Sequence, residues 1–176
     1  MNQIDFFRSN PPRCLANFAV TPCELPGVEF DGHGEPLNTI FRVACYCGSA
    51  KHFIVGYNWQ NPDFGNQSVF LSPILLRCES CARLTELIDT DIHGHDGEQG
   101  GSCTVRSEGR QQDFGCFNCG PRSFEVFTRF EYPSDLLDGD CELYRGRESD
   151  FFTWFSLRGI CSECKTFQDI TDYECA

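Results

Sequence analysis

The sequence predicts a mainly β fold with little helix, in which two repeated antiparallel sheets share a Phe-rich core. Three observations lead to this prediction. Four pairs of closely spaced cysteines occur along the chain, the segments that carry them repeat, and apolar residues alternate with polar ones between them. Seventeen Phe in 176 residues supply enough apolar surface for one common core.

The segment after Gly120 gives the clearest strand pattern. In "SFEVFTRFEY" every second residue from Phe124 to Tyr132 is apolar or Thr, which is typical of a strand with one buried face. The run "DFFTWFSLRGI", residues 150–160, is apolar on much of both faces and is predicted as a second, covered strand. In the first half of the chain, "HFIVGYNW" and "SVFLSPILL" are predicted to play the same two parts.

Two alignments of the chain with itself indicate a duplication. Setting Cys45 on Cys116, 71 residues later, aligns Phe53 with Phe124. Setting Cys78 on Cys161 aligns Leu84 with Phe167, Leu87 with Ile170 and Asp89 with Asp172. We therefore predict an irregular N-terminal extension over residues 1–40, a first repeat over residues 41–102 and a second repeat over residues 103–176.

The cysteine pairs favour metal binding. Thirteen Cys is an odd number, so they cannot all pair as intramolecular disulfides. Zinc in structural sites takes four tetrahedral ligands, and a turn that carries two cysteines can direct two thiolates at one ion. Taken in chain order, the pairs predict two structural Zn²⁺ sites, formed by Cys45, Cys47, Cys78 and Cys81 and by Cys116, Cys119, Cys161 and Cys164. Disulfides, metal-free structural pairs and a redox-active CxxC are the alternatives.

These cysteine turns, the glycines after Cys47 and Cys119, and the strands between the turns resemble those of zinc-ribbon proteins. They also resemble, more loosely, the β-sheet folds pinned by paired zinc knuckles that are called β-tents. The resemblance covers residues 41–89 and 112–173, and it implies a duplicated zinc-ribbon-like fold with two structural zinc ions. The chain departs from the usual CxxC knuckle at Cys45 and Cys47, which form a CxC.

Five cysteines and two histidines remain outside these pairs. The cysteines are Cys14, Cys23, Cys103, Cys141 and Cys175, and His93 and His95 lie with several carboxylates in the Gly-rich segment 89–101. These residues are interpreted either as ordinary thiols and a solvated linker or as ligands of a further metal ion.

The sequence predicts no enzymatic activity. His33 and Glu35 spell the H-x-E of zinc deaminases, but helix-breaking residues surround them, and Arg77 rather than Pro precedes the pair that begins at Cys78. Four sulfur ligands leave a zinc ion no open position for water, which catalytic zinc requires.

The charge favours a protein partner. Fourteen Lys and Arg against 26 Asp and Glu give a net charge of -12, whereas nucleic-acid binding relies on a basic surface. We expect a non-enzymatic, zinc-stabilised module that binds a basic protein, such as an immunity protein or antitoxin that neutralises a toxin enzyme. The alternative is a zinc-ribbon protein that binds nucleic acid or acts in transcription. The candidate partner-binding residues are Asp135, Asp138, Asp140, Glu142, Tyr144, Glu148 and Asp150.

The sequence carries no pattern typical of export or membrane insertion. No positively charged leader followed by an apolar run opens it, and no apolar run is long enough to span a bilayer. We therefore expect a cytoplasmic protein without a membrane partner. Thiols stay reduced in that compartment, which favours metal ligation over disulfides.

Overall fold

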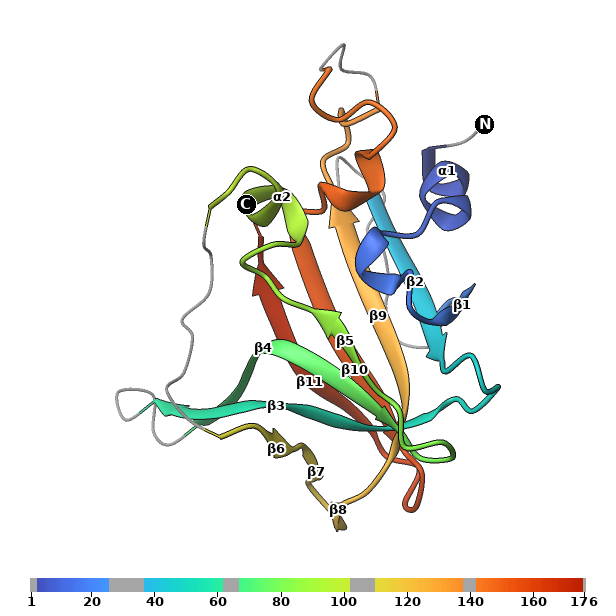
Figure 1. The fold of residues 1–176 in the computed structure, drawn as a ribbon, viewed down its shortest axis with the longest axis vertical. Coiled ribbons are helices and arrows are strands. Elements are labelled where there is room, and N and C mark those ends of the chain that lie inside the picture. The colour runs from blue at the N-terminus through green and yellow to red at the C-terminus, as the bar shows by residue number, and fades with distance from the viewer. Residues whose placement is uncertain (1–2, 26–36, 62–66, 102–109, 138–141, 176) are drawn as a thin grey trace.

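The computed structural model describes residues 3–25, 37–61, 67–101, 110–137 and 142–175 (Figure 1). The chain is mainly β with little helix, as predicted, and the strand pairs within these ranges are all antiparallel. The helices are α1 (Gln3–Ser9), η1 (Arg13–Leu15), α2 (Gly94–Glu98) and η3 (Glu148–Asp150). The strands are β1 (Ala19–Pro22), β2 (Leu37–Ala44), β3 (Lys51–Asn61), β4 (Gln67–Cys78), β5 (Leu84–Ile88), β6 (Gln112–Asp113), β7 (Gly115–Cys116), β8 (Gly120–Pro121), β9 (Phe124–Tyr132), β10 (Trp154–Cys161) and β11 (Phe167–Glu174).

Strand β9 joins the two halves of the chain into one curled sheet. On one side it pairs with β10 along its length, and β10 pairs with β11. On its other side β9 pairs with β3 at Phe124 and Glu125 and with β2 from Val126 onward. The units β3–β4–β5 and β9–β10–β11 therefore converge at one corner of the molecule and separate toward the other end (Figure 1).

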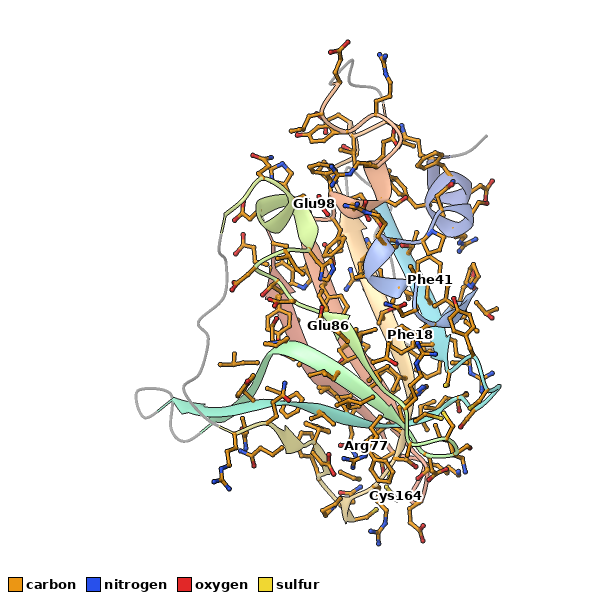
Figure 2. The ribbon with its side chains drawn as sticks, viewed as in Figure 1. Phe18, Phe41, Arg77, Glu86, Glu98 and Cys164 are labelled. Atoms are coloured by element: carbon orange, nitrogen blue, oxygen red, sulfur yellow. The ribbon has the colours of Figure 1, made fainter. Side chains whose placement is uncertain are left out.

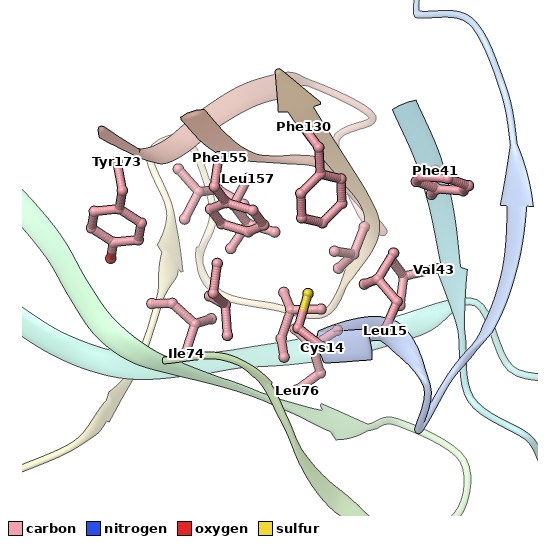
Figure 3. Packing of buried hydrophobic residues seen from close by; sticks show 14 of the residues in the cluster. Cys14, Leu15, Phe41, Val43, Ile74, Leu76, Phe130, Phe155, Leu157 and Tyr173 are labelled. Atoms are coloured by element: carbon pink, nitrogen blue, oxygen red, sulfur yellow. The ribbon is translucent and has the colours of Figure 1, made fainter. Parts of the chain in front are cut away.

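The core fills the space between these two units. Phe130, Phe155 and Leu157 from β9 and β10 face Ile74 and Leu76 of β4 (Figure 3). The alternation predicted after Gly120 is observed, because Phe124, Val126, Thr128, Phe130 and Tyr132 are all buried. This common Phe-rich core agrees with the predicted fold class.

The two units carry the same β-bulge. The β4–β5 register shifts after Ile74, which leaves Leu87 as an extra residue, and the β10–β11 register shifts after Leu157, which leaves Ile170 as an extra residue. Both extra residues are buried in the core. The self-alignment of the sequence pairs Leu87 with Ile170, so each unit places the same position in the same irregular conformation.

The alignment of Phe53 with Phe124 is wrong by one residue. The turn that begins at Cys45 is one residue shorter than the turn that begins at Cys116. Each residue of β3 therefore corresponds to the β9 residue one position later than the alignment places it. His52, which is 1% exposed, occupies the place of the fully buried Phe124, whereas Phe53 is only half-buried. A shift by one residue exchanges the two faces of a strand, which explains the error.

The N-terminal segment contributes to the core before the first cysteine turn. It contains α1, η1, β1 and the start of β2. Phe7 of α1 stacks on Tyr132 with ring centroids 3.9 Å apart, and Cys14 and Leu15 of η1 are buried in the core (Figure 3). None of the described helices is long and apolar enough to cross a membrane.

The segment 89–101 is packed rather than a solvated linker. It forms α2, and the amides of His95 and Asp96 donate hydrogen bonds of 2.8 Å to the carbonyls of Phe152 and Cys175. Gly94 has a φ of +82°, and a Cβ at this position would lie 2.7 Å from the Cβ of Cys175. Only glycine fits both the conformation and the close approach.

Candidate metal centres

The fold brings the first predicted ligand set together at the converging corner. This first four-cysteine site consists of Cys45, Cys47, Cys78 and Cys81, whose Sγ atoms all lie within 4.8 Å of one another. The Sγ atoms of Cys45 and Cys81 are 3.6 Å apart, and those of Cys47 and Cys78 are 3.5 Å apart. Tetrahedral zinc with Zn–S bonds of about 2.3 Å separates its sulfur ligands by about 3.8 Å, so these distances fit a zinc–thiolate site.

The second four-cysteine site has the same dimensions. It consists of Cys116, Cys119, Cys161 and Cys164, and Cys164 lies at the converging corner (Figure 2). Sγ of Cys116 is 3.7 Å from that of Cys119 and 3.6 Å from that of Cys164. A disulfide would require about 2.05 Å. All eight cysteines are free thiols, which excludes the disulfide alternative for both sets.

Corresponding turns hold the ligands in both sites. The amide of Cys78 bonds the Arg83 carbonyl at 2.9 Å, and the amide of Cys161 bonds the Thr166 carbonyl at 3.0 Å. Inside these turns Ala82 and Lys165 adopt the left-handed conformation, with φ of 58° and 60°. The other two turns use glycine for this conformation, at Gly48 and Gly120. Each pair of cysteines is thus placed by a tight turn at the end of a strand.

Ser123 connects the two sites directly. Its hydroxyl donates to the Glu79 carboxylate at 2.6 Å, and its Oγ lies 2.8 Å from the Ser162 hydroxyl. Glu79 follows the ligand Cys78, and Ser162 follows the ligand Cys161. The amides of these two residues also bond equivalent carbonyls, those of Lys51 and Ser123, at 3.0 Å each. The turns of the two sites therefore share one hydrogen-bonded network.

Hydrogen bonds prepare a thiolate in the second site. The side chain and the amide of Thr166 lower the pKa of Cys164 to about 6, because they bond its sulfur. The interaction with Cys164 in turn raises the pKa of Cys119 to about 12. One ligand is thus held as a thiolate at neutral pH while another retains its proton until a cation arrives.

The first site also combines one cysteine whose pKa is lowered with one whose pKa is raised. Burial raises the pKa of Cys78, but the amides of Cys81 and Ser80 outweigh this effect and lower the pKa to about 6. The Ser49 amide lowers the pKa of Cys47, whereas its neighbouring thiols raise it, to about 12. Binding of a divalent cation must therefore displace a proton from each site.

Sequence reasoning missed Gln168. This residue of β11 is 4% exposed, and its Nε2 donates to Sγ of Cys116 at 2.9 Å while its Oε1 accepts from the Phe117 amide at 3.2 Å. Gln168 thus orients a ligand 52 positions away in the sequence. No sequence pattern pointed to it, since the self-alignment that sets Cys78 on Cys161 places Thr85 at this position.

No third metal site forms in the described part of the chain. There, only the two four-cysteine sites bring three or more Cys, His or carboxylate ligand atoms together. Nδ1 of His93 accepts from the Asp89 amide at 3.0 Å, and Nε2 of His95 lies 2.9 Å from Nε2 of Gln99. The described extra cysteines, Cys14, Cys23 and Cys175, are free thiols. Cys103, Cys141, His33 and Glu35 lie outside the described residues.

The candidate partner-binding residues occupy different surroundings. Asp135 and Glu142 are exposed, and Asp138 and Asp140 lie outside the described residues. The ring of Tyr144 packs on Phe151 at 4.5 Å, and Glu148 accepts from the Gly146 amide at 2.9 Å. Asp150 is buried, where it accepts from the Arg13 amide at 2.8 Å and pairs with its guanidinium. The five described candidates therefore differ in their exposure, since Asp135 and Glu142 are exposed whereas Asp150 is buried.

Comparison with protein-family models, curated proteins and solved structures gave no match for this chain. The two four-cysteine sites are consistent with duplicated zinc-ribbon-like motifs on the geometry of their own residues. Each site could hold one metal ion, and its four sulfur donors and its dimensions suit zinc.

Proposed function

We propose that this chain is a non-enzymatic protein-binding module of β-tent-like fold, stabilised by two structural zinc ions, and that its partner is a basic protein. The observation that carries the proposal is the composition of the two metal centres. Four thiolates complete the tetrahedral sphere of each ion and leave no position for water or substrate. In this proposal each metal ion stabilises the fold, and the surface of the fold binds the partner protein.

The position of the sites supports a structural role for the metal. Both sites lie where the strands of the two units converge, and the Ser123 hydroxyl bonds both turns. Two ions at this corner would fix the angle between β3–β4–β5 and β9–β10–β11, and they would stabilise the core between the units. Binding free energy at such sites is folding free energy, because the ligand set does not exist in the unfolded chain.

The charge supports a basic partner. The chain carries a net charge of -12, and each zinc with four thiolates adds two further negative charges to that of protonated cysteines. Such a field accelerates association with a basic protein and disfavours nucleic acid. An inhibitor of a basic enzyme, such as an immunity protein or antitoxin that neutralises a toxin, is the class of protein that fits these properties.

An affinity capture tests this function. The zinc-loaded chain is immobilised, exposed to lysate at low and at high salt, and the retained proteins are identified by mass spectrometry. We expect one basic protein that binds in equimolar amount, elutes with salt and loses its enzymatic activity in the complex. Retention of no stoichiometric partner, or of an acidic one, would contradict the proposal.

A specific observation favours nucleic-acid binding as the second candidate. Phe117 and Tyr46 stand at equivalent positions of the two N-terminal cysteine turns, and they are 75% and 62% exposed. The exposed Arg122 follows the turn that carries Phe117. Exposed rings beside cations can stack on single-stranded bases. Filter binding of single-stranded RNA over a salt series distinguishes the two functions, since this candidate requires affinity that falls steeply with salt.

A further inference from the structure

An open groove lies on the outer face of the β9–β10–β11 unit, on the side away from the core. Its volume is about 660 Å³. Its lining includes Arg129, Glu131, Trp154, Ser156, Arg158 and Asp172, and Glu174 follows on the same strand as Asp172. None of the eight metal-centre cysteines lines this groove, so it is a separate surface.

The register of the strands sets acidic side chains around an aromatic ring. Trp154 of β10 pairs with Glu131 of β9 on one side and with Glu174 of β11 on the other. In the next row Ser156 pairs with Asp172 of β11. Side chains directly opposite in a sheet lie about 5 Å apart, so Trp154 has a carboxylate on either side. A tryptophan face flanked by carboxylates suits a lysine or arginine side chain.

The two arginines that line the groove pair with Glu131 and Asp169, so they do not neutralise Asp172 and Glu174. Nη2 of Arg129 pairs with Glu131 at 2.5 Å, and Nε of Arg158 pairs with Asp169 at 2.7 Å. Asp172 and Glu174 are exposed, and neither forms an ion pair with a described residue. The net charge that the groove offers to a ligand is therefore negative along β11.

Strand β11 also offers a free edge. Among the described strands it pairs with β10 alone, so no described strand forms a ladder of hydrogen bonds with its other edge. Its eight residues include three acidic ones and no Lys or Arg. An extended peptide can add to such an edge through main-chain hydrogen bonds, with every second side chain directed to the same face.

We propose that an extended basic segment of the partner protein adds as a strand to the open edge of β11 and places its cations against Trp154, Asp172 and Glu174. This inference rests on the proposed function, which it deepens by assigning the interface. The backbone supplies the affinity that does not depend on sequence. The acids and the indole select arginine or lysine at alternate positions, and a nucleic-acid phosphate would meet carboxylates instead.

The test uses the full zinc-loaded chain and a defined probe. The probe is a fluorescent peptide of alternating Arg and Val, as long as the eight-residue β11, with both ends blocked. Anisotropy at low salt measures its binding, and the same peptide with Glu in place of Arg should not bind. N-methylation of the amides on one edge should abolish binding, because it removes the donors of the added strand.

A double variant, Asp172→Lys with Glu174→Lys, should weaken binding of the Arg-Val peptide by about tenfold or more. The matched control is Asp5→Lys with Glu24→Lys, which makes the same charge change at exposed acids elsewhere and should weaken binding by less than about threefold. Zinc content and circular dichroism of both variants should equal those of the parent chain. Trp154→Leu should also weaken binding, through loss of the cation–π contact.

Three outcomes would overturn the inference. The first is an equal loss of affinity for the Arg-Val peptide in the two double variants. The second is a larger loss of affinity in the control variant, and the third is undiminished binding of the N-methylated peptide. Each of these would leave the basic-partner function standing, since the basic peptide still binds. If the parent chain binds no basic peptide, the groove assignment fails, and the affinity capture then decides the proposed function separately.

Discussion

His52 and Phe124 are direct partners across the β3–β9 pairing, and both side chains are buried. Each lies four residues after the glycine of its N-terminal cysteine turn, Gly48 or Gly120. This pair therefore lies where β3–β4–β5 joins β9–β10–β11. One unit places an apolar ring at this junction, and the other places an imidazole that is 1% exposed.

Replacement of His52 by Phe should stabilise the protein. No described residue forms a hydrogen bond of normal geometry with either ring nitrogen, and burial lowers the pKa of His52 below its ordinary value of 6.5 despite the Ala50 carbonyl. Removal of the polar imidazole nitrogens from the core should raise the free energy of unfolding by about 1 to 2 kcal/mol. Urea denaturation at pH 8, with metal content checked, measures the change.

The pH dependence gives this prediction a second readout. The unfolded chain protonates His52 near pH 6.5, but the folded chain keeps it neutral, so its contribution to stability is constant above pH 6.5 and falls below it. The stability difference between parent and His52→Phe should therefore increase from pH 8 to pH 6. A variant that is less stable, with an unchanged pH profile, would show that the imidazole has a partner in the folded chain.

The local chemistry of the cysteine turns was predictable from sequence, whereas contacts between distant segments were not. Spacing and residue type identified both ligand sets, since a pair of thiolates in a tight turn is a local feature. The shift from Phe53 to His52 was missed because one residue in a turn changes which face of the strand is buried. The burial of Asp150 depends on Arg13, 137 positions away, and no periodicity in the sequence brings these two residues together.

Two metal ions per chain are expected by elemental mass spectrometry of untagged protein. A variant with Cys161→Ser and Cys164→Ser should retain one ion, because it removes half of the ligands of the second four-cysteine site. The control is Cys23→Ser, which changes a half-buried thiol outside both sites and should retain two ions. Three ions in the parent chain, or two in the double variant, would require ligands other than the eight assigned here.

Gln168→Met should weaken metal binding in the second site alone. The substitution keeps the volume of the side chain but removes the 2.9 Å hydrogen bond that Nε2 donates to the Cys116 sulfur. Loss of such an outer contact typically lowers metal affinity between about 10-fold and 100-fold. Competition with a chromophoric chelator should show one weakened and one unchanged ion. The first site is thus an internal control, and equal weakening of both ions would indicate a general loss of structure.

Zinc affinity should rise with pH. Cys47 and Cys119, with pKa values of about 12, carry protons at neutral pH in the metal-free chain and must lose them on metal binding. Each displaced proton makes the affinity about tenfold greater per pH unit. Chelator competition at several pH values between about 6.5 and 8.5 measures the slope, and unbuffered titration measures the protons released. Acid should release the metal and unfold the chain, and a slope of zero would contradict this mechanism.

Asp150→Asn should destabilise the N-terminal segment. Asp150 and Glu98 form a network with Arg13 and Arg147, in which Nη2 of Arg13 lies 2.6 Å from Oε1 of Glu98. Asparagine keeps the shape but removes the charge from a buried side chain that faces two guanidinium groups. We expect the free energy of unfolding to fall by about 1 to 3 kcal/mol. This is less than the usual cost of breaking a buried ion pair, because the Arg13 side chain is 61% exposed.

The same variant separates a structural role of Asp150 from the partner-binding role that the sequence indicated. If the ion pairs anchor η1, limited proteolysis of Asp150→Asn should cut before β2 faster than in the parent chain, while partner affinity measured on the intact chain stays the same. Asp135→Asn, at an exposed acid, should leave both proteolysis and stability unchanged. Unchanged stability together with weaker partner binding in Asp150→Asn would instead place this carboxylate at the interface, against its burial in the network.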